Sequence, residues 1–129
     1  MDMVKFRCYT SDGFSGFCAW YEAQPMSVRG SIVAVVEGLE RVPRARWRRR
    51  AFALLSNPNC AGLGEIRIEK SGVHYRILGF DSSTEEEFIL LFGFRKDLDP
   101  AYSVSCPIAK VRKAEVQHDP DKSYPCRLS

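Results

Sequence analysis

Arg67 and Arg76 flank a predicted hairpin turn at a spacing that brings their charges together. If the turn consists of Ser71-Gly72 alone, counting back along the two strands places Arg67 directly opposite Arg76. Like charges directly opposite one another destabilise a strand pair, so such a pair calls for a compensating anion. The spacing therefore predicts that this hairpin binds a phosphate-rich ligand.

RNA cleavage is one reaction that such a hairpin could support. Attack by a ribose 2′-hydroxyl needs a base for that hydroxyl, a cation for the phosphate and an acid for the leaving 5′-oxygen. Arginine stays charged and grips phosphate with two N–H groups, so Arg67 and Arg76 suit the cation role but are poor proton carriers. His74 is the titratable candidate, and by the same register it lies opposite Glu69, which could orient its ring. The alternative is that His74 and Glu69 form only an exposed cross-strand ion pair.

Two further interpretations of these charges remain open. Arg67 and Arg76 can form a solvated face that Glu65 and Glu69 neutralise without any ligand. Farther along the chain, Arg95-Lys96 ends the last predicted strand. This pair either contacts phosphate or is simply a polar strand end.

A second group of cations lies between residues 44 and 50, where five arginines accompany Trp47. This segment fits an RNA-binding patch in which the cations follow the phosphates and the indole offers a stacking face. The alternative is that Trp47 packs into the core while the arginines point outward, towards an acidic protein segment.

The sequence contains no phosphate-cradling glycine loop, metal-ligand cluster or nucleophile elbow, so we expect neither a metal nor a cofactor. Its cysteines are odd in number and include no Cys-x-x-Cys pair. We expect them to be reduced thiols that pack as small hydrophobic side chains. The five positions are Cys8, Cys18, Cys60, Cys106 and Cys126.

The elements that would position these residues indicate an α+β fold with a small, mostly antiparallel sheet. Alternating and helical spacings predict a first strand, two helices, a short basic helix, a three-strand meander and a C-terminal helix. The expected ranges are 3–9, 14–21, 27–39, 47–55, 63–70, 73–80, 88–95 and 108–116. We expect one domain over residues 1–118, followed by a loosely ordered tail over 119–129.

Bulk composition supports a folded domain rather than a disordered chain. The 129 residues are 45% hydrophobic and 12% aromatic, which suffices for a core without metal or disulfide crosslinks. The net charge of +3 is weak by itself, so the distribution of the cations is more informative than their sum. No signal-peptide pattern or membrane span is evident, and we therefore expect a cytoplasmic protein.

The order of elements, with the segments in it, resembles the RelE/HigB-like toxins of bacterial type II toxin–antitoxin modules, and in particular their phage-derived HigB-like branch. The resemblance covers most of residues 3–118. The matching segments are Leu63-Gly64-Glu65-Ile66-Arg67, Tyr75-Arg76-Ile77-Leu78 and Leu90-Leu91-Phe92-Gly93-Phe94-Arg95-Lys96, with Phe52-Ala53-Leu54-Leu55 before them and Ile108-Ala109-Lys110-Val111-Arg112 after them.

This resemblance implies a metal-independent endoribonuclease that cleaves mRNA, in the best-known members within the ribosomal A site, and that a cognate antitoxin protein neutralises. Carried over by position, Arg67 and Arg76 would hold the phosphate, and Lys96 with Arg95 would stabilise the transition state. Tyr102 would stack on a base or help the proton transfer. One departure is Glu65, which occupies a place where the type members carry lysine or arginine.

The expected site therefore has two groups of residues. The catalytic candidates are Arg67, Arg76, Lys96, His74 and Tyr102, and the RNA-binding candidates are Arg95, Lys70, Arg48 and Arg49. The expected partners are the antitoxin, mRNA and the ribosome, with no membrane. The alternatives are a non-catalytic RNA-, ribosome- or protein-binding module on the same fold, and a partner subunit whose arginines serve only a protein interface. An enzyme requires the cations to converge near a proton donor, whereas a binding module needs only the charge.

Overall fold

The alternating residues in the middle of the chain form three consecutive antiparallel strands. They are β3 (Gly64–Lys70), β4 (Val73–Asp81) and β5 (Glu87–Arg95). Ser71 and Gly72 form the two-residue turn between β3 and β4, both with positive φ angles (54° and 80°) that suit a tight hairpin. The predicted register is confirmed, because Arg67 pairs with Arg76 and Glu69 pairs with His74.

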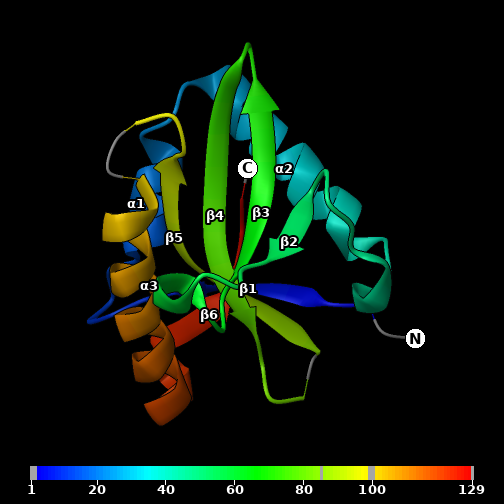
Figure 1. The fold of residues 1–129 in the computed structure, drawn as a ribbon. Helices are drawn as coiled ribbons and strands as arrows, with labels where there is room; N and C mark the ends of the chain where they lie inside the picture. Colours follow the sequence, from blue (N-terminus) through cyan, green and yellow to red (C-terminus); the bar gives the residue numbers. More distant parts are fainter. Residues whose placement is uncertain (1–2, 85, 99–100, 129) are drawn as a thin grey trace.

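A six-stranded sheet is built around this meander in the computed structural model, which describes residues 3–84, 86–98 and 101–128. The remaining strands are β1 (Lys5–Tyr9), β2 (Phe52–Leu54) and β6 (Ser123–Pro125). The strand order is β2-β3-β4-β5-β1-β6 (Figure 1). Only the β1–β5 pair is parallel, so the sheet is mostly antiparallel, as predicted.

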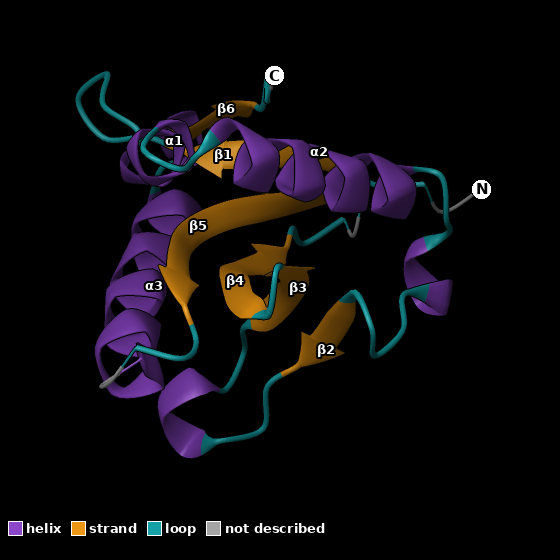
Figure 2. Cartoon of the chain, turned by 90° about the horizontal axis from the view of Figure 1, so that it is seen from above, coloured by secondary structure: helices purple, strands orange, loops and turns teal. Residues whose placement is uncertain are grey.

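Three α-helices complete the part of the fold that the structure describes: α1 (Gly16–Glu22), α2 (Met26–Glu40) and α3 (Ala101–His118). The apolar stripe of α2 lies within the range predicted from helical spacing, 27–39, and packs in a cluster that includes Ile77, with Val35 only partly buried. The stripe consists of Val28, Ile32, Val35, Val36 and Leu39. Residues of α3 pack in a second cluster that includes Leu78. Because Ile77 and Leu78 are neighbours on one strand, the two clusters lie on opposite faces of the sheet (Figure 2). The α+β prediction is confirmed.

The predicted short basic helix over residues 47–55 is wrong. Trp47 is extended (φ −64°, ψ 130°), and Phe52 pairs with Ile66 in the sheet. Trp47 and Phe52 join Phe88 in an aromatic cluster with ring centroids 5.1–5.7 Å apart. This aromatic packing outweighs any local preference of the arginine-rich segment for a helix.

The C-terminal helix begins at Ala101, well before the predicted start at residue 108, and contains Pro107 within it. A proline inside a helix removes one backbone hydrogen bond, a loss that packing of this part of the helix must offset. Buried Cys106 and Ala109 hold this part of the helix against the sheet. No helix of the described residues is long and apolar enough to cross a membrane.

The cysteines differ from the prediction as well. Cys8 is bonded to Cys126 and Cys60 to Cys106, and only Cys18 of the five is a free thiol. The first disulfide joins β1 to the segment that was expected to be loosely ordered. In place of a loose tail, residues 123–125 form β6 beside β1.

Candidate functional site

A single buried carboxylate organises the basic face of the hairpin. Glu65 is only 1% exposed, although it is an acidic residue on a strand. Its Oε2 accepts a hydrogen bond from Nε of Arg67 (2.8 Å), and its Oε1 accepts one from the hydroxyl of Tyr102 (2.6 Å). Nε of Arg76 lies 3.7 Å from the same Oε1. Glu65 therefore holds three of the predicted catalytic side chains together.

Strand geometry explains why these residues meet. Glu65 and Arg67 are two positions apart on β3, so their side chains share one face of the sheet. Arg76 shares that face because it pairs directly with Arg67. Helix α3 covers this face from the other end of the chain, and the ring of Tyr102 packs edge-on against Phe94 at 5.2 Å between centroids.

The two arginines differ in the donor groups that they keep available. Nη1 of Arg67 donates to the carbonyl of Arg49, and Nη1 of Arg76 donates to the carbonyl of Tyr75, both at 3.0 Å. Nη2 of Arg67 has no hydrogen-bond partner among the described residues, whereas the Arg76 guanidinium also interacts with the hydroxyl of Tyr102. The Arg67 side chain is 33% exposed and that of Arg76 is 7% exposed. Nη2 of Arg67 can therefore bind an anion that approaches the hairpin, and the positive charge of Arg76 lies beside it.

The charge of Glu65 changes the interpretation of the opposed arginines. Glu65 supplies the anion that the opposed Arg67 and Arg76 require, so their pairing does not by itself demand an external phosphate. Two arginine charges against one carboxylate still leave a positive charge on the hairpin. Glu69 is exposed and contributes no ion pair to this cluster.

Tyr102 is held in its protonated form. Burial is the main cause, and the hydrogen bond and charge of Glu65 add to it, so that the pKa of the Tyr102 phenol rises to about 12 against the opposing effect of Arg76. At neutral pH the phenol cannot act as a base. Its hydroxyl proton is already donated to Glu65, which makes Tyr102 a group that fixes the carboxylate in place.

The other polar candidates of the hairpin surround this cluster. His74 is half-buried opposite Glu69, but no hydrogen bond or ion pair joins the two side chains in the described part of the chain. The backbone N–H of Lys96 donates to the carbonyl of His74 (2.9 Å), which places Lys96 at the end of the same strand ladder with an exposed side chain. Lys70 lies half-buried next to the turn.

Arg95 does not join the cluster. It pairs with Tyr75, whereas Phe94 pairs with Arg76, so Arg95 points to the opposite face of the sheet. Its Nη2 lies 2.6 Å from Oδ2 of Asp97. This hydrogen bond raises the pKa of Arg95 and lowers that of Asp97.

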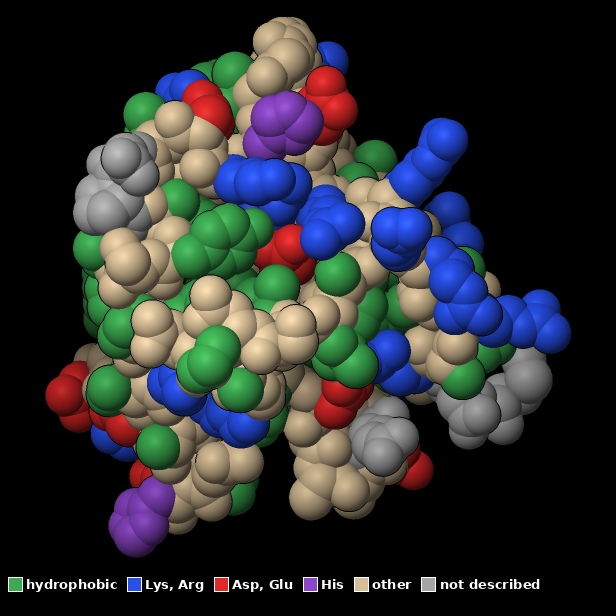
Figure 3. Space-filling view, in the orientation of Figure 1, with side chains coloured by type: hydrophobic (Ala, Val, Ile, Leu, Met, Phe, Trp, Pro, Cys, Tyr) green, Lys and Arg blue, Asp and Glu red, His purple; other side chains and the backbone are tan. Residues whose placement is uncertain are grey.

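The arginine-rich segment lies beside the hairpin, at the edge formed by β2. Its contact with the cluster is the hydrogen bond from Arg67 to the carbonyl of Arg49. The Arg48 guanidinium folds back onto the carbonyls of Ala45 and Trp47. Figure 3 shows basic side chains across the β3–β4 hairpin and beyond β2 on the same view of the molecule.

Trp47 cannot serve as a stacking face for RNA bases. Its side chain is buried (5% exposed), and its indole N–H donates to the carbonyls of Leu39 and Val42. The indole packs in the core while Arg48 and Arg49 remain exposed. This is the second of the two arrangements that the sequence allowed for this segment.

Sequence reasoning missed two features of the site. Glu65 was noted only as a neutralising charge or a departure from a pattern, although its two-residue spacing from Arg67 on a strand signals a shared face. The disulfide between Cys60 and Cys106 had no local signal, and it ties α3 to the loop before β3 one turn away from Tyr102. Within the described residues, no three His, Cys, Asp or Glu side chains gather so that they could hold a metal ion.

Comparison with known proteins gives one match. The model of the family described as phage-derived protein Gp49-like (DUF891) matches residues 19–114, which contain α2, the whole meander and most of α3. The search of curated proteins found no match, and neither did the search of solved structures.

Proposed function

The chain belongs to the phage-derived Gp49-like family, which is related to the RelE/HigB-like toxins, and from this premise we propose that it is the toxin of a type II toxin–antitoxin system. Its activity would be that of a metal-independent endoribonuclease that cleaves mRNA on the ribosome, in the cytoplasm. A cognate antitoxin protein would neutralise it.

The observation that carries this proposal is the clamped arginine pair. Glu65 fixes Arg67 through Nε and lies next to Arg76, yet Nη2 of Arg67 remains without a partner among the described residues. Rigid donors that are already oriented bind a phosphate, and stabilise the charge that develops on it, at a low cost in entropy. A clamped, partly open arginine pair suits transition-state binding better than two mobile surface side chains would.

In the proposed reaction the two arginines bind the non-bridging oxygens of the scissile phosphate. Lys96 extends the positive surface along the RNA backbone, whereas Lys70, which pairs with Val73, lies on the other face of the hairpin. His74 accepts the proton of the 2′-hydroxyl, whose oxygen bonds to phosphorus as the bond to the 5′-oxygen breaks. The products are a 2′,3′-cyclic phosphate and, after proton uptake from solvent, a 5′-hydroxyl. Tyr102 keeps Glu65 in place and transfers no proton.

A second candidate function is a non-catalytic module that binds RNA, the ribosome or a protein through the same face. Neutralisation of the arginines by Glu65 favours this alternative, because it lowers the positive charge available at the phosphate position. The lack of a contact between His74 and Glu69 also favours it, since no carboxylate among the described residues is hydrogen-bonded to the imidazole. This function needs only the residual charge of the hairpin.

Primer extension on mRNA from a cell-free translation reaction tests the two functions against each other. We expect new cuts that require both the protein and translation, that disappear with Arg67→Ala and that persist with Arg41→Ala, an exposed arginine at the end of α2. His74→Gln should abolish cutting while leaving RNA binding within about twofold of the wild type, since binding depends on the arginines. Each variant is checked for an unchanged circular-dichroism spectrum.

Intact mRNA in all reactions, with undiminished translation, would contradict the nuclease. Intact mRNA with translation slowed in an Arg67-dependent manner would favour the binding module. Because cytoplasmic thiols are kept reduced, the reactions are run with and without a reductant. This comparison also shows which form of the disulfides is active.

A further inference from the structure

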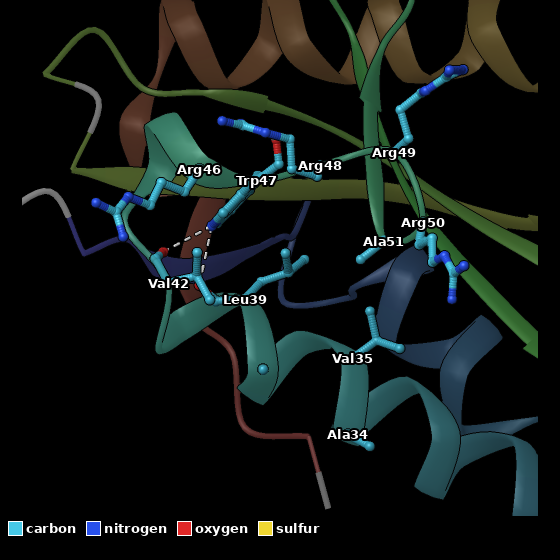
Figure 4. Close-up of a pocket in the computed structure, with 11 residues that line it drawn as sticks. Ala34, Val35, Leu39, Val42, Arg46, Trp47, Arg48, Arg49, Arg50 and Ala51 are labelled. Atoms are coloured by element: carbon cyan, nitrogen blue, oxygen red, sulfur yellow. Dashed lines mark hydrogen bonds between the residues drawn. The ribbon is translucent and has the colours of Figure 1, made fainter.

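A groove with an apolar floor and a basic rim lies on the side of the sheet away from the candidate site. It runs between α2 and the segment that leads into β2, with a volume of about 560 Å³ (Figure 4). The floor is formed by small and aliphatic side chains and one glycine, and the rim by four arginines. The lining residues are Ala34, Val35, Gly38, Leu39, Val42, Trp47 and Ala51, with Arg46, Arg48, Arg49 and Arg50.

The positive charge of this rim is not compensated within the described part of the protein. None of the four arginines forms an ion pair there, whereas Arg44 in the same segment is paired with Asp81 at 2.7 Å. No acidic residue lines the groove. The nearest acidic residues of α2, Glu37 and Glu40, line a different hollow beside Phe6. The groove therefore presents uncompensated cations next to an apolar surface.

From this combination we infer that the groove binds an acidic amphipathic segment of a partner protein. Apolar side chains of such a segment would pack on Val35 and Ala51, and its carboxylates would meet the arginines at the two ends. Figure 4 shows Arg46 beside Val42 at one end and Arg50 beside Ala51 at the other. Carboxylates pair well with guanidinium groups, and apolar contact excludes the water that would weaken those pairs.

RNA fits this groove less well. Its bases need an exposed aromatic face on which to stack, and Trp47, the aromatic residue in the lining, is buried against the ring of Phe6 at 5.6 Å between centroids. An aliphatic floor gives RNA no favourable contact. The inference holds whether or not the hairpin face cleaves RNA, because none of the catalytic candidates lines the groove. Arg49 contributes its carbonyl to the hairpin cluster and its side chain to the groove.

Selection from a display library tests the inference with the intact protein. The library presents random peptides of the length of α2, and peptides that bind the wild-type protein are sequenced and synthesised. We expect enrichment of sequences in which Asp or Glu alternates with Leu, Ile or Val at helical or strand spacing. Their affinities are then measured by fluorescence anisotropy, in parallel with a short single-stranded RNA.

Two kinds of variant separate the roles of charge and shape. Arg46→Glu/Arg50→Glu reverses two exposed rim charges whose side chains make no hydrogen bond with a described residue, and it should weaken peptide binding by about tenfold or more. Gly38→Leu fills the groove, since a Cβ at Gly38 meets nothing within 4 Å, and it should weaken binding by about as much. Arg41→Glu/Arg127→Glu makes the same charge change at exposed positions outside the groove and should leave the affinity within about twofold.

Three results would overturn the inference. One is a selected pool without acidic and apolar alternation. Another is peptide binding that Gly38→Leu leaves unchanged, which would mean that charge alone attracts the peptides. The third is a pair of observations: Arg46→Glu/Arg50→Glu abolishes RNA binding, and no selected peptide depends on the groove for binding. This result would assign the surface to RNA.

Discussion

Replacing Glu65 with glutamine tests the clamp on the arginine pair most directly. Glu65→Gln keeps the size of the side chain but removes the charge that faces Arg67 and Arg76. Removing one partner of a buried ion pair typically costs about 3–5 kcal/mol. Because Arg67 is 33% exposed and glutamine can still accept the Tyr102 hydrogen bond, we expect the low end of that range, about 3 kcal/mol.

Urea denaturation followed by circular dichroism measures this loss, and an unchanged m-value would show that the unfolded state is not altered. The physical cause is tested by adding Arg76→Met to Glu65→Gln. If uncompensated cations are responsible, the added substitution should recover about 1–2 kcal/mol, although it is destabilising in the wild type. Inorganic phosphate should also stabilise the Glu65→Gln variant more than the wild type, since the anion can replace the lost carboxylate.

Two results would refute this reasoning. Stability of Glu65→Gln within about 0.5 kcal/mol of the wild type would mean that the carboxylate does not compensate the arginines. Equal costs of Arg76→Met with and without Glu65→Gln would mean that the two side chains are energetically independent.

Three other predictions concern the surroundings of the site. The pKa of the Tyr102 phenol is raised from 10.0 to about 12, so its contribution to stability is complete below pH 10 and is lost towards pH 12. In urea titrations, the difference in unfolding free energy between the wild type and Tyr102→Phe should therefore shrink from pH 10 to pH 12. A difference that stays constant over this range would contradict the prediction. Cys60→Ser/Cys106→Ser removes a disulfide between positions 46 residues apart and should lower the unfolding free energy by about 4 kcal/mol. Adding a reductant should then lower the stability of this variant less than it lowers that of the wild type. Gly93→Ala places a methyl group against the indole of Trp20 in α1 and should lower the unfolding free energy by about 1–3 kcal/mol. The matched Gly38→Ala meets open space and should raise stability by about 0.5–1 kcal/mol, as thermal unfolding would show.

The meander could be predicted from the sequence because its determinants are local. A two-residue turn fixes the pairing of every residue in the hairpin, so the opposition of Arg67 and Arg76 followed from Ser71-Gly72 alone. The α2 stripe was equally visible because it depends only on helical spacing.

The features that could not be predicted depend on distant contacts. Phe52 lies in a strand because Trp47 and Phe88 surround it, which no local pattern encodes. The disulfide between Cys60 and Cys106 depends on the packing of α3. The approach of Tyr102 to Glu65 likewise requires the helix to cross the sheet. The role of the hairpin residues in RNA cleavage stays a prediction.

The parallel pairing of β1 with β5 sets an order on the folding of this protein. β1 precedes the meander in the chain, yet its sheet neighbours β5 and β6 both follow β4. The β3–β4–β5 meander needs no residue from β1 and can form as a local unit. Pairing of β1 with β5 requires closure of the long loop between them, which has a higher entropic cost and is slower. Until β1 arrives, one edge of β5 is open to pairing with another chain. β1 precedes the meander in the chain but joins the sheet after it, and β6 then pairs with the other edge of β1, so the nascent protein is most prone to aggregate before β1 pairs with β5.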